Sequence, residues 1–133
     1  MLVVLVSSLG SLTAAQAYEP AMNYTLQCMG CHTPDGEGVP GHVPSIRATL
    51  LPFARMEAGR QFLVQVPGAS QSRLSNAELA TLLNWMIENL SAERGEYQRF
   101  TEEEVAGYRT HALVEVRATR ERLLAVQPAS GKP

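Results

Sequence analysis

The sequence predicts an all-α fold for this chain of 133 residues. The clearest helix signal runs from Ser75 to Leu90, where Ser75 and Glu78 form a capping box and apolar residues then recur on one helical face. Thr101 and Glu104 repeat the capping-box pattern and predict a second helix start. No segment alternates apolar and polar residues as a half-buried strand does. These observations favour a helical protein, and 45% hydrophobic residues are enough to form its core.

Shorter helices are predicted on both sides of the 75–90 element, and glycine or proline is expected to end two of them. A helix over residues 52–58 is expected to stop at Gly59, and one over residues 60–66 is expected to close at Pro67 and Gly68. Six glycines and prolines between residues 33 and 44 predict a loop there. The remaining predicted helices cover residues 20–27, a stretch opening at Thr101, and residues 117–126.

The first seventeen residues have the character of an export signal. An apolar run begins at Leu2, and the stretch ends in a small-x-small pattern at residues 15–17. It carries no charge and is too short to span a bilayer comfortably, so we expect a signal peptide, with an uncleaved anchor as the alternative. No later segment approaches transmembrane length. The mature chain is therefore expected outside the cytoplasm without a membrane span.

The mature chain divides by composition into three parts. Residues 18–90 contain both cysteines and are predicted to form the main domain, residues 91–127 form a charge-dense helical extension, and residues 128–133 form a flexible tail. Eleven basic and thirteen acidic residues give a net charge of −2. This balance argues against a nucleic-acid binder that works by neutralising phosphates.

The predicted chemistry lies in the pentapeptide Cys28-Met29-Gly30-Cys31-His32. Two thiols three positions apart can add to the two vinyl groups of one haem, and the histidine that follows the second thiol is then held at the iron as an axial ligand. The order assigns the roles: Cys28 and Cys31 form thioethers, and His32 supplies the proximal nitrogen. The pattern therefore predicts one covalently attached haem c.

Three other interpretations of the cysteine pair explain less of the pattern. A redox-active dithiol usually opens a helix after a strand in a βαβ unit, and no such unit is evident. A structural zinc ion needs four ligands, and a second cysteine pair is missing. A structural disulfide gives no reason for the adjacent His32.

With this motif the chain resembles the small exported class I c-type cytochromes. The resemblance covers about residues 20–90 and rests on four features. They are the attachment motif, the glycine- and proline-rich loop of residues 35–40, a proline at position 44, and a closing helix that contains Trp85. The resemblance implies an all-α fold around one haem, in which the first and last helices cross. It also implies one-electron transfer as the activity.

The resemblance further implies roles for two residues beside the haem. A proline carbonyl at about the position of Pro44 accepts the proton on the second ring nitrogen of the axial histidine, and Pro40 is the competitor for this role. Trp85 is expected to pack the last helix of the domain against the first. Separately, an arginine can pair with a haem propionate through a forked hydrogen bond, and Arg60 is the first choice.

The sixth iron ligand departs from the family pattern. The family usually places a methionine in the loop before the last helix, but residues 64–70 of this chain contain none. Met86, on the apolar face of the last helix, is therefore the first choice, and Met56 is the second. Core packing is the simpler role for both. The remaining alternatives are Met22, His42, His111 and an open five-coordinate iron.

Two classes of function follow, neither of them catalytic. The first is a periplasmic carrier of single electrons between a redox protein donor and a redox protein acceptor. The second is an electron-transfer subunit or partner dedicated to one periplasmic oxidoreductase such as a dehydrogenase, which the extension beyond residue 90 favours. A haem enzyme or gas sensor with an open distal site is a weaker alternative, since no distal His-plus-Arg pair is evident.

Overall fold

The computed structural model describes residues 18–127, and in this range the chain forms helices and no strand, which confirms the predicted all-α class. The predicted signal peptide, residues 1–17, and the predicted tail, residues 128–133, lie outside the described residues. The helices of the described range are α1 (Pro20–Gln27), α2 (Met29–His32), α3 (Leu50–Ala54), α4 (Glu57–Gln65), α5 (Pro67–Ser70), α6 (Asn76–Leu90), α7 (Glu102–Tyr108) and α8 (Val116–Val126).

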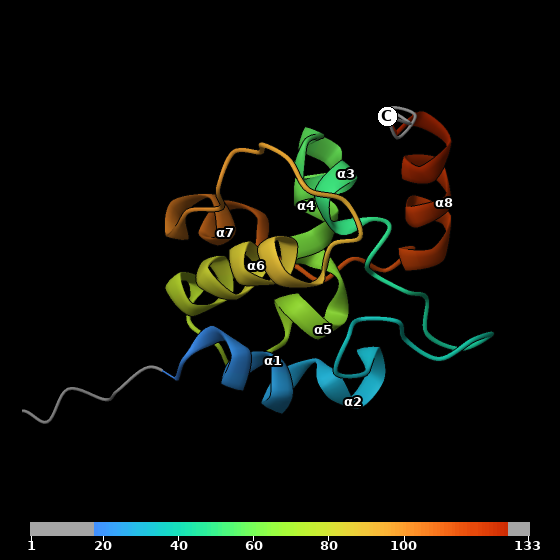
Figure 1. The fold of residues 1–133 in the computed structure, drawn as a ribbon. Helices are drawn as coiled ribbons and strands as arrows, with labels where there is room; N and C mark the ends of the chain where they lie inside the picture. Colours follow the sequence, from blue (N-terminus) through green and yellow to red (C-terminus); the bar gives the residue numbers. More distant parts are fainter. Residues whose placement is uncertain (1–17, 128–133) are drawn as a thin grey trace, which may run out of the picture.

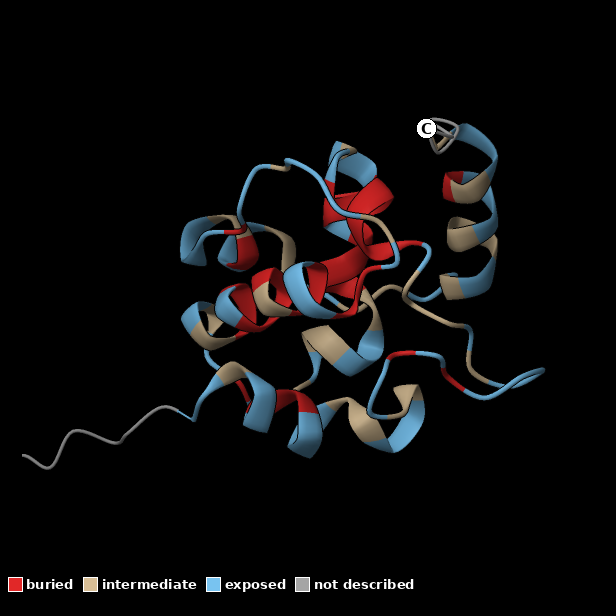
Figure 2. Ribbon diagram, viewed as in Figure 1, coloured by how far each residue is buried: buried red, intermediate tan, exposed pale blue. Residues whose placement is uncertain are grey.

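The helix α6 runs through the middle of the molecule. Figure 1 shows α1 and α2 on one side of it, α3 and α4 on the other, and α7 alongside. Buried residues concentrate on α3, α4 and α6 (Figure 2), where the T-shaped pair Phe53 and Phe62 meets the leucines of α6. The cysteine motif lies at the edge of this core, since Cys28 and Met29 pack against it but are only partly buried.

The predicted start of α6 is confirmed. The Ser75 hydroxyl accepts from the Glu78 backbone N–H at 3.2 Å, and Glu78 Oε2 accepts from the Ser75 backbone N–H at 2.8 Å. Both halves of the capping box are therefore present. Trp85, on the same helix, lies 5.7 Å from the ring of Tyr24 on α1, so α6 packs against the first helix as expected.

The predicted helix boundary at Gly59 is wrong, whereas the one near Pro67 is confirmed. The chain breaks at Met56, the N-cap of α4, and Gly59 lies inside that helix. A Cβ at Gly59 would come 2.4 Å from the carbonyl oxygen of Phe53, so this glycine permits α3 and α4 to approach and does not end a helix. The helix α4 ends at Gln65 with Val66 as its C-cap, and Pro67 begins α5, where its missing N–H costs nothing.

The extension beyond residue 90 packs onto the rest of the molecule. Its two predicted helices are present as α7 and α8, and the Thr101 hydroxyl caps α7 by accepting from Glu104 N–H at 3.3 Å. The buried side chain of Asn84 on α6 pairs with both backbone groups of Phe100, at 2.9 Å and 3.0 Å. No helix among residues 18–127 is long and apolar enough to cross a membrane.

Candidate haem site

Cys28, Cys31 and His32 are brought together by the short helix α2. The carbonyl oxygen of Cys28 accepts from the backbone N–H groups of Cys31 at 3.1 Å and His32 at 3.0 Å. This single turn places the second thiol and the imidazole three and four residues after the first thiol, which is the spacing of neighbours on a helix surface. Both cysteines are free thiols, with Cys28 half-buried and Cys31 exposed.

The imidazole of His32 is oriented toward the loop that follows it. Its Nδ1 atom is buried and has no hydrogen-bond partner. Burial lowers the pKa of His32, and the nearby backbone carbonyl of Pro44 opposes this by raising it. Burial thus disfavours the charged imidazolium, and the neutral ring is the form in which histidine binds iron. A carbonyl beside the ring is what the predicted role of Pro44 needs, although that role stays a prediction.

Glycine at position 38 allows the loop to return to His32. The Gly38 backbone N–H donates to the His32 carbonyl at 3.1 Å, and its φ of +72° is in the left-handed region. A Cβ there would lie 2.4 Å from the carbonyl oxygen of Val43 and 2.8 Å from that of Pro44. Any other residue would push the loop away, so Gly38 determines where the Pro44 carbonyl lies.

Tyr24 holds the residue that follows the motif in place, a role that the sequence did not reveal. Its side chain is 2% exposed, and its hydroxyl donates to the Thr33 carbonyl at 2.6 Å. Thr33 itself has a φ of 62°, an uncommon value for a residue with a side chain. Burial, with the nearby charges of Cys28 and Asp35, raises the pKa of Tyr24 to about 12, so the hydroxyl remains a donor.

The thiol chemistry does not favour a redox-active dithiol. Burial, and next the charge of Cys31, raise the pKa of Cys28 to about 11. A reactive disulfide-exchange thiol needs the opposite shift, because the thiolate is the nucleophile. Nor do three or more His, Cys, Asp or Glu side chains of residues 18–127 gather where they could hold a metal ion, as a structural zinc ion would require.

The candidate distal ligands differ in exposure. Met86 is 8% exposed within the core, and Met56 is partly buried at the start of α4. Met22 is 48% exposed on the outer face of α1. His42 and His111 are both exposed. Met86 and Met56 therefore remain the candidates for an enclosed ligand.

The expectation that Arg60 binds a propionate needs correction. The residue is 6% exposed, and its guanidinium pairs with both carboxylate oxygens of Glu104 at 2.5 Å and stacks on the Phe100 ring at 4.0 Å. Its remaining N–H groups donate to the carbonyls of Ala54, Gln98 and Arg99. All five donors are used, so none is left for a propionate. Arg60 instead holds the extension on α4.

The surroundings of α2 fit a large apolar group. Neither α2 nor α5 has a buried residue, although both belong to a well-packed molecule (Figure 2). Several apolar side chains near them pack against the core but remain partly open, namely Cys28, Met29, Ile46, Val66, Ala69 and Trp85. These residues match what a haem plate would cover.

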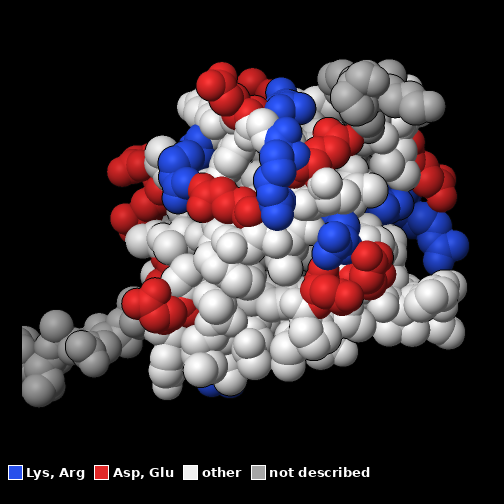
Figure 3. All heavy atoms as spheres, viewed as in Figure 1, with Lys and Arg blue, Asp and Glu red and all other residues white. Residues whose placement is uncertain are grey.

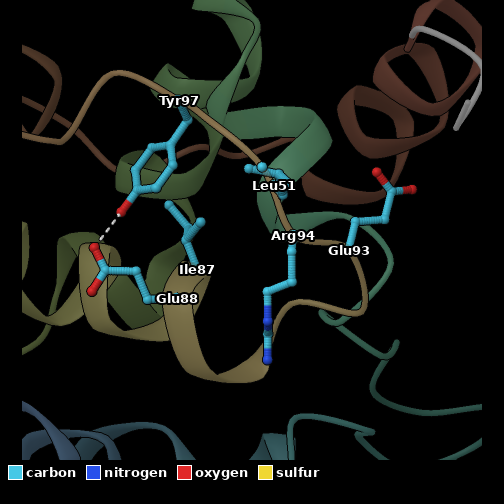
Figure 4. A pocket seen from close by; sticks show the side chains of 7 residues that line it. Leu51, Ile87, Glu88, Glu93, Arg94 and Tyr97 are labelled. Atoms are coloured by element: carbon cyan, nitrogen blue, oxygen red, sulfur yellow. Dashed lines mark hydrogen bonds between the residues drawn. The ribbon is translucent and has the colours of Figure 1, made fainter.

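A separate pocket lies elsewhere in the molecule. Its volume is about 140 Å³, and Figure 4 shows the Tyr97 hydroxyl directed at the Glu88 carboxylate across one side, at 3.1 Å. No residue of the predicted haem site lines it. The lining residues are Leu51, Ile87, Glu88, Glu93, Arg94, Gly95 and Tyr97.

Charge is distributed unevenly over the surface. In Figure 3 the part over α1 and α2 is mostly free of charged side chains, which gather toward α3, α7 and α8. The first basic residue of the chain is Arg47, and α1 exposes the apolar side chains of Met22 and Leu26. Contacts made over this face are therefore mainly apolar, with little attraction for a charged partner.

Cytochromes c-552 are among the proteins similar to this chain. No protein-family model matches the chain. It is similar to a cytochrome c-552 of Thermus thermophilus, with 30% identity over 135 residues that cover 86% of this chain and 89% of the relative. A second cytochrome c-552 of Thermus thermophilus is 27% identical over 117 residues, covering 72% of this chain and 88% of that protein.

The helical fold and the Cys28–His32 motif together define a haem-binding protein of the c type. The extent of the first similarity establishes the family: the chain belongs to the c-type cytochromes, electron-transfer proteins that carry haem iron.

Proposed function

We propose that this protein is an exported cytochrome that carries single electrons through one haem c bound covalently to Cys28 and Cys31. The observation that carries the proposal is the arrangement of α2, which presents two free thiols and a half-buried imidazole in one turn. When bound, the haem supplies a reversible one-electron iron couple.

The residues of this chain have distinct tasks around that group. Cys28 and Cys31 hold it, and His32 is the proximal iron ligand. The Pro44 carbonyl accepts the Nδ1 proton of His32, which fixes the tautomer and the plane of the ring. Trp85 provides an apolar wall. Met86 is the proposed distal ligand, with Met56 as the second choice.

The proposed location is the periplasm. It rests on the signal-like segment of residues 1–17, which lies outside the described residues. There the partners are a redox protein that donates electrons and another that accepts them. The weakly charged surface over α1 and α2 (Figure 3) suits transient apolar docking near the haem.

A second candidate is a dedicated electron-transfer partner of a periplasmic dehydrogenase. The observation in its favour is the extension with α7 and α8, which a freely diffusing carrier does not need. Purification of the tagged protein from its native periplasm decides between the two. Stoichiometric recovery of one oxidoreductase supports the dedicated role, and recovery of the cytochrome alone supports the free carrier.

The central test replaces the attachment residues. In the Cys28→Ser/Cys31→Ser variant no haem should remain bound after acid-acetone extraction, since both thioethers are lost. His32→Ala should give a high-spin or misligated haem and poor maturation, because the strong-field proximal nitrogen is gone. The matched control His42→Ala changes an exposed histidine of the neighbouring loop and should leave the visible spectrum unchanged. Covalent haem in the double variant would refute the proposal.

A further inference from the structure

Arg109, at the end of α7, is bound to the backbone that connects α5 to α6. Its guanidinium donates to the carbonyl oxygens of Ser70 at 2.9 Å, Ser72 at 2.6 Å and Leu74 at 2.5 Å. It also donates to the Ser72 hydroxyl at 3.1 Å and to Asn76 Oδ1 at 3.3 Å. These contacts use as many donors as a guanidinium has, and all the acceptors are neutral. Arg109 therefore stabilises one particular conformation of the backbone between α5 and α6.

Gln65, the last residue of α4, anchors the start of the same segment. Its side chain is buried and donates from Nε2 to the Tyr108 carbonyl at 2.9 Å. Its own carbonyl accepts from the Leu113 backbone N–H at 2.8 Å. The segment of residues 66–74, which contains α5, is therefore held at both ends by residues 108–113 of the extension.

This segment borders the candidate haem site. Figure 1 shows α5 on the same side of α6 as α2, the helix that carries His32. Val66 and Ala69 pack against the core but are only partly buried, and α5 has no buried residue. A haem bound to α2 would cover these exposed apolar side chains. The position of α5 would then determine how much of this side of the haem is shielded from solvent.

We propose that Arg109 is a positioning residue for the haem: it holds α5 over the side of the haem site that faces away from α2, and so limits access of small ligands to the iron. This inference rests on the proposed function, since it requires a haem held by α2. The planar guanidinium of arginine, bound to three carbonyl groups, restricts the backbone more than the single ammonium group of a lysine can. The extension thereby acts on the haem without contacting it.

The test compares Arg109→Ala, Arg109→Lys and the control Arg99→Ala as holoproteins. Arg99 also joins the extension to the rest of the molecule, through an exposed pair with Glu88, but its side chain forms no hydrogen bond or ion pair with residues 66–76. Two quantities are measured: hydrogen exchange of the amides in residues 66–76, and the rate of carbon monoxide binding to the reduced protein. Covalent haem is verified first in the unmodified protein, and its absence there would refute the proposed function and with it this inference.

In Arg109→Ala, exchange in residues 66–76 should be at least about tenfold faster, as expected when a charge-assisted hydrogen bond is lost. Carbon monoxide should bind faster, and the reduction potential should fall as solvent reaches the haem. Arg109→Lys should show intermediate rates of hydrogen exchange and of carbon monoxide binding. If the alanine variant yields no holoprotein, the lysine variant is compared with the unmodified protein instead. Arg99→Ala should match the unmodified protein. Faster exchange with an unchanged carbon monoxide rate and potential would show that Arg109 only stabilises the fold, and would overturn the inference.

Discussion

At the scale of single residues, the two candidate distal methionines differ in how far the protein encloses them. Met86 is 8% exposed among the core residues of α6, whereas Met56 caps α4 and is only partly buried. An apolar enclosure suits a thioether whether it packs or binds iron. Burial therefore does not separate the two roles, and single variants are needed.

Met86→Leu should preserve the fold, because such a volume-conserving change usually costs less than about 1.5 kcal/mol. If Met86 binds the iron, the variant loses the weak near-infrared band that marks sulfur ligation, its reduction potential falls, and carbon monoxide binds readily. Met56→Leu is the matched control and should keep all three properties. Near-infrared absorption of the oxidised protein is the measurement.

The opposite pattern would identify Met56 as the ligand and leave Met86 as a packing residue. A band that survives both substitutions, or that is missing from the unmodified protein, would exclude methionine ligation by this pair. A histidine or an open site would then have to supply the sixth position. Because His42 and His111 are exposed, the open site would be the better supported of these.

At the scale of elements, the contact between α3 and α4 depends on the missing side chain of Gly59. A Cβ at this position would lie 2.4 Å from the Phe53 carbonyl oxygen and 2.7 Å from its Cα, both backbone atoms that cannot rotate away. Gly59→Ala should therefore lower the free energy of unfolding by about 1–3 kcal/mol, the usual cost of overpacking. This exceeds the gain of up to about 1 kcal/mol from helix propensity.

Gly107→Ala provides the control for this measurement. Gly107 also lies in a helix, but a Cβ there would meet nothing within 4 Å. Its replacement should be neutral or stabilising by up to about 1 kcal/mol in urea unfolding of the holoprotein. Equal effects of the two substitutions would mean that α3 and α4 can separate without cost.

The capping box of α6 predicts a dependence of stability on pH. The Ser75 backbone N–H, and next its hydroxyl, lower the pKa of the Glu78 carboxyl by hydrogen bonding to its charged form. Since the pKa is lower in the folded state, the stabilisation is complete above the ordinary pKa of glutamate and is lost as the pH falls through the lowered value. The advantage of the unmodified protein over Glu78→Gln should thus disappear on acidification.

Thermal unfolding of both proteins from neutral to acidic pH measures this difference. Ser75→Ala should cost about 1 kcal/mol at neutral pH through the lost N-cap. A constant difference between Glu78→Gln and the unmodified protein at all pH values would show that the Glu78 charge does not contribute. Glu103, exposed in the first turn of α7, is a suitable second site for the same comparison because its pKa is also lowered.

At the scale of the whole molecule, what the sequence predicts well is local along the chain. The capping box joins two residues of one helical turn, and the glycines of the loop after His32 act on neighbours. The motif proposed to attach haem, whose role stays a prediction, is a pentapeptide. In each case the residues that interact are close in sequence, so their spacing is informative. The helix end near Pro67 is also a local feature, and it was predicted correctly. The boundary at Gly59 was mispredicted because that glycine serves a tertiary contact between α3 and α4.

The interactions that the sequence could not reveal join distant segments. Arg60 and its partner Glu104 are 44 residues apart, and Arg109 reaches Ser70 across 39. Neither arginine differs in its sequence surroundings from one on a solvated surface. Burial of Arg60 leaves its charge in need of compensation, which the Glu104 carboxylate and three carbonyls provide. Only the fold brings these groups together.

The location of the core divides the molecule into two parts that should depend differently on haem. The buried residues of α3, α4, α6 and α7 pack against one another, whereas α2 and α5 bury none of their own. Because hydrophobic burial is the main stabilising term, α2, the loop of residues 33–49 and α5 need the haem as a packing partner. Without haem, the region of residues 18–90 is therefore expected to be only partly folded.

In the Cys28→Ser/Cys31→Ser protein, which cannot retain haem by thioethers, hydrogen exchange should be fast in α2, residues 33–49 and α5. Amides of α6 and α7 should stay protected, since Asn84 still binds Phe100 and Arg60 still binds Glu104. Exchange followed by mass spectrometry, with the unmodified holoprotein as reference, resolves these segments. Uniformly fast exchange would show that the haem supports the entire fold, and uniform protection would show that α2 and α5 are stable without it.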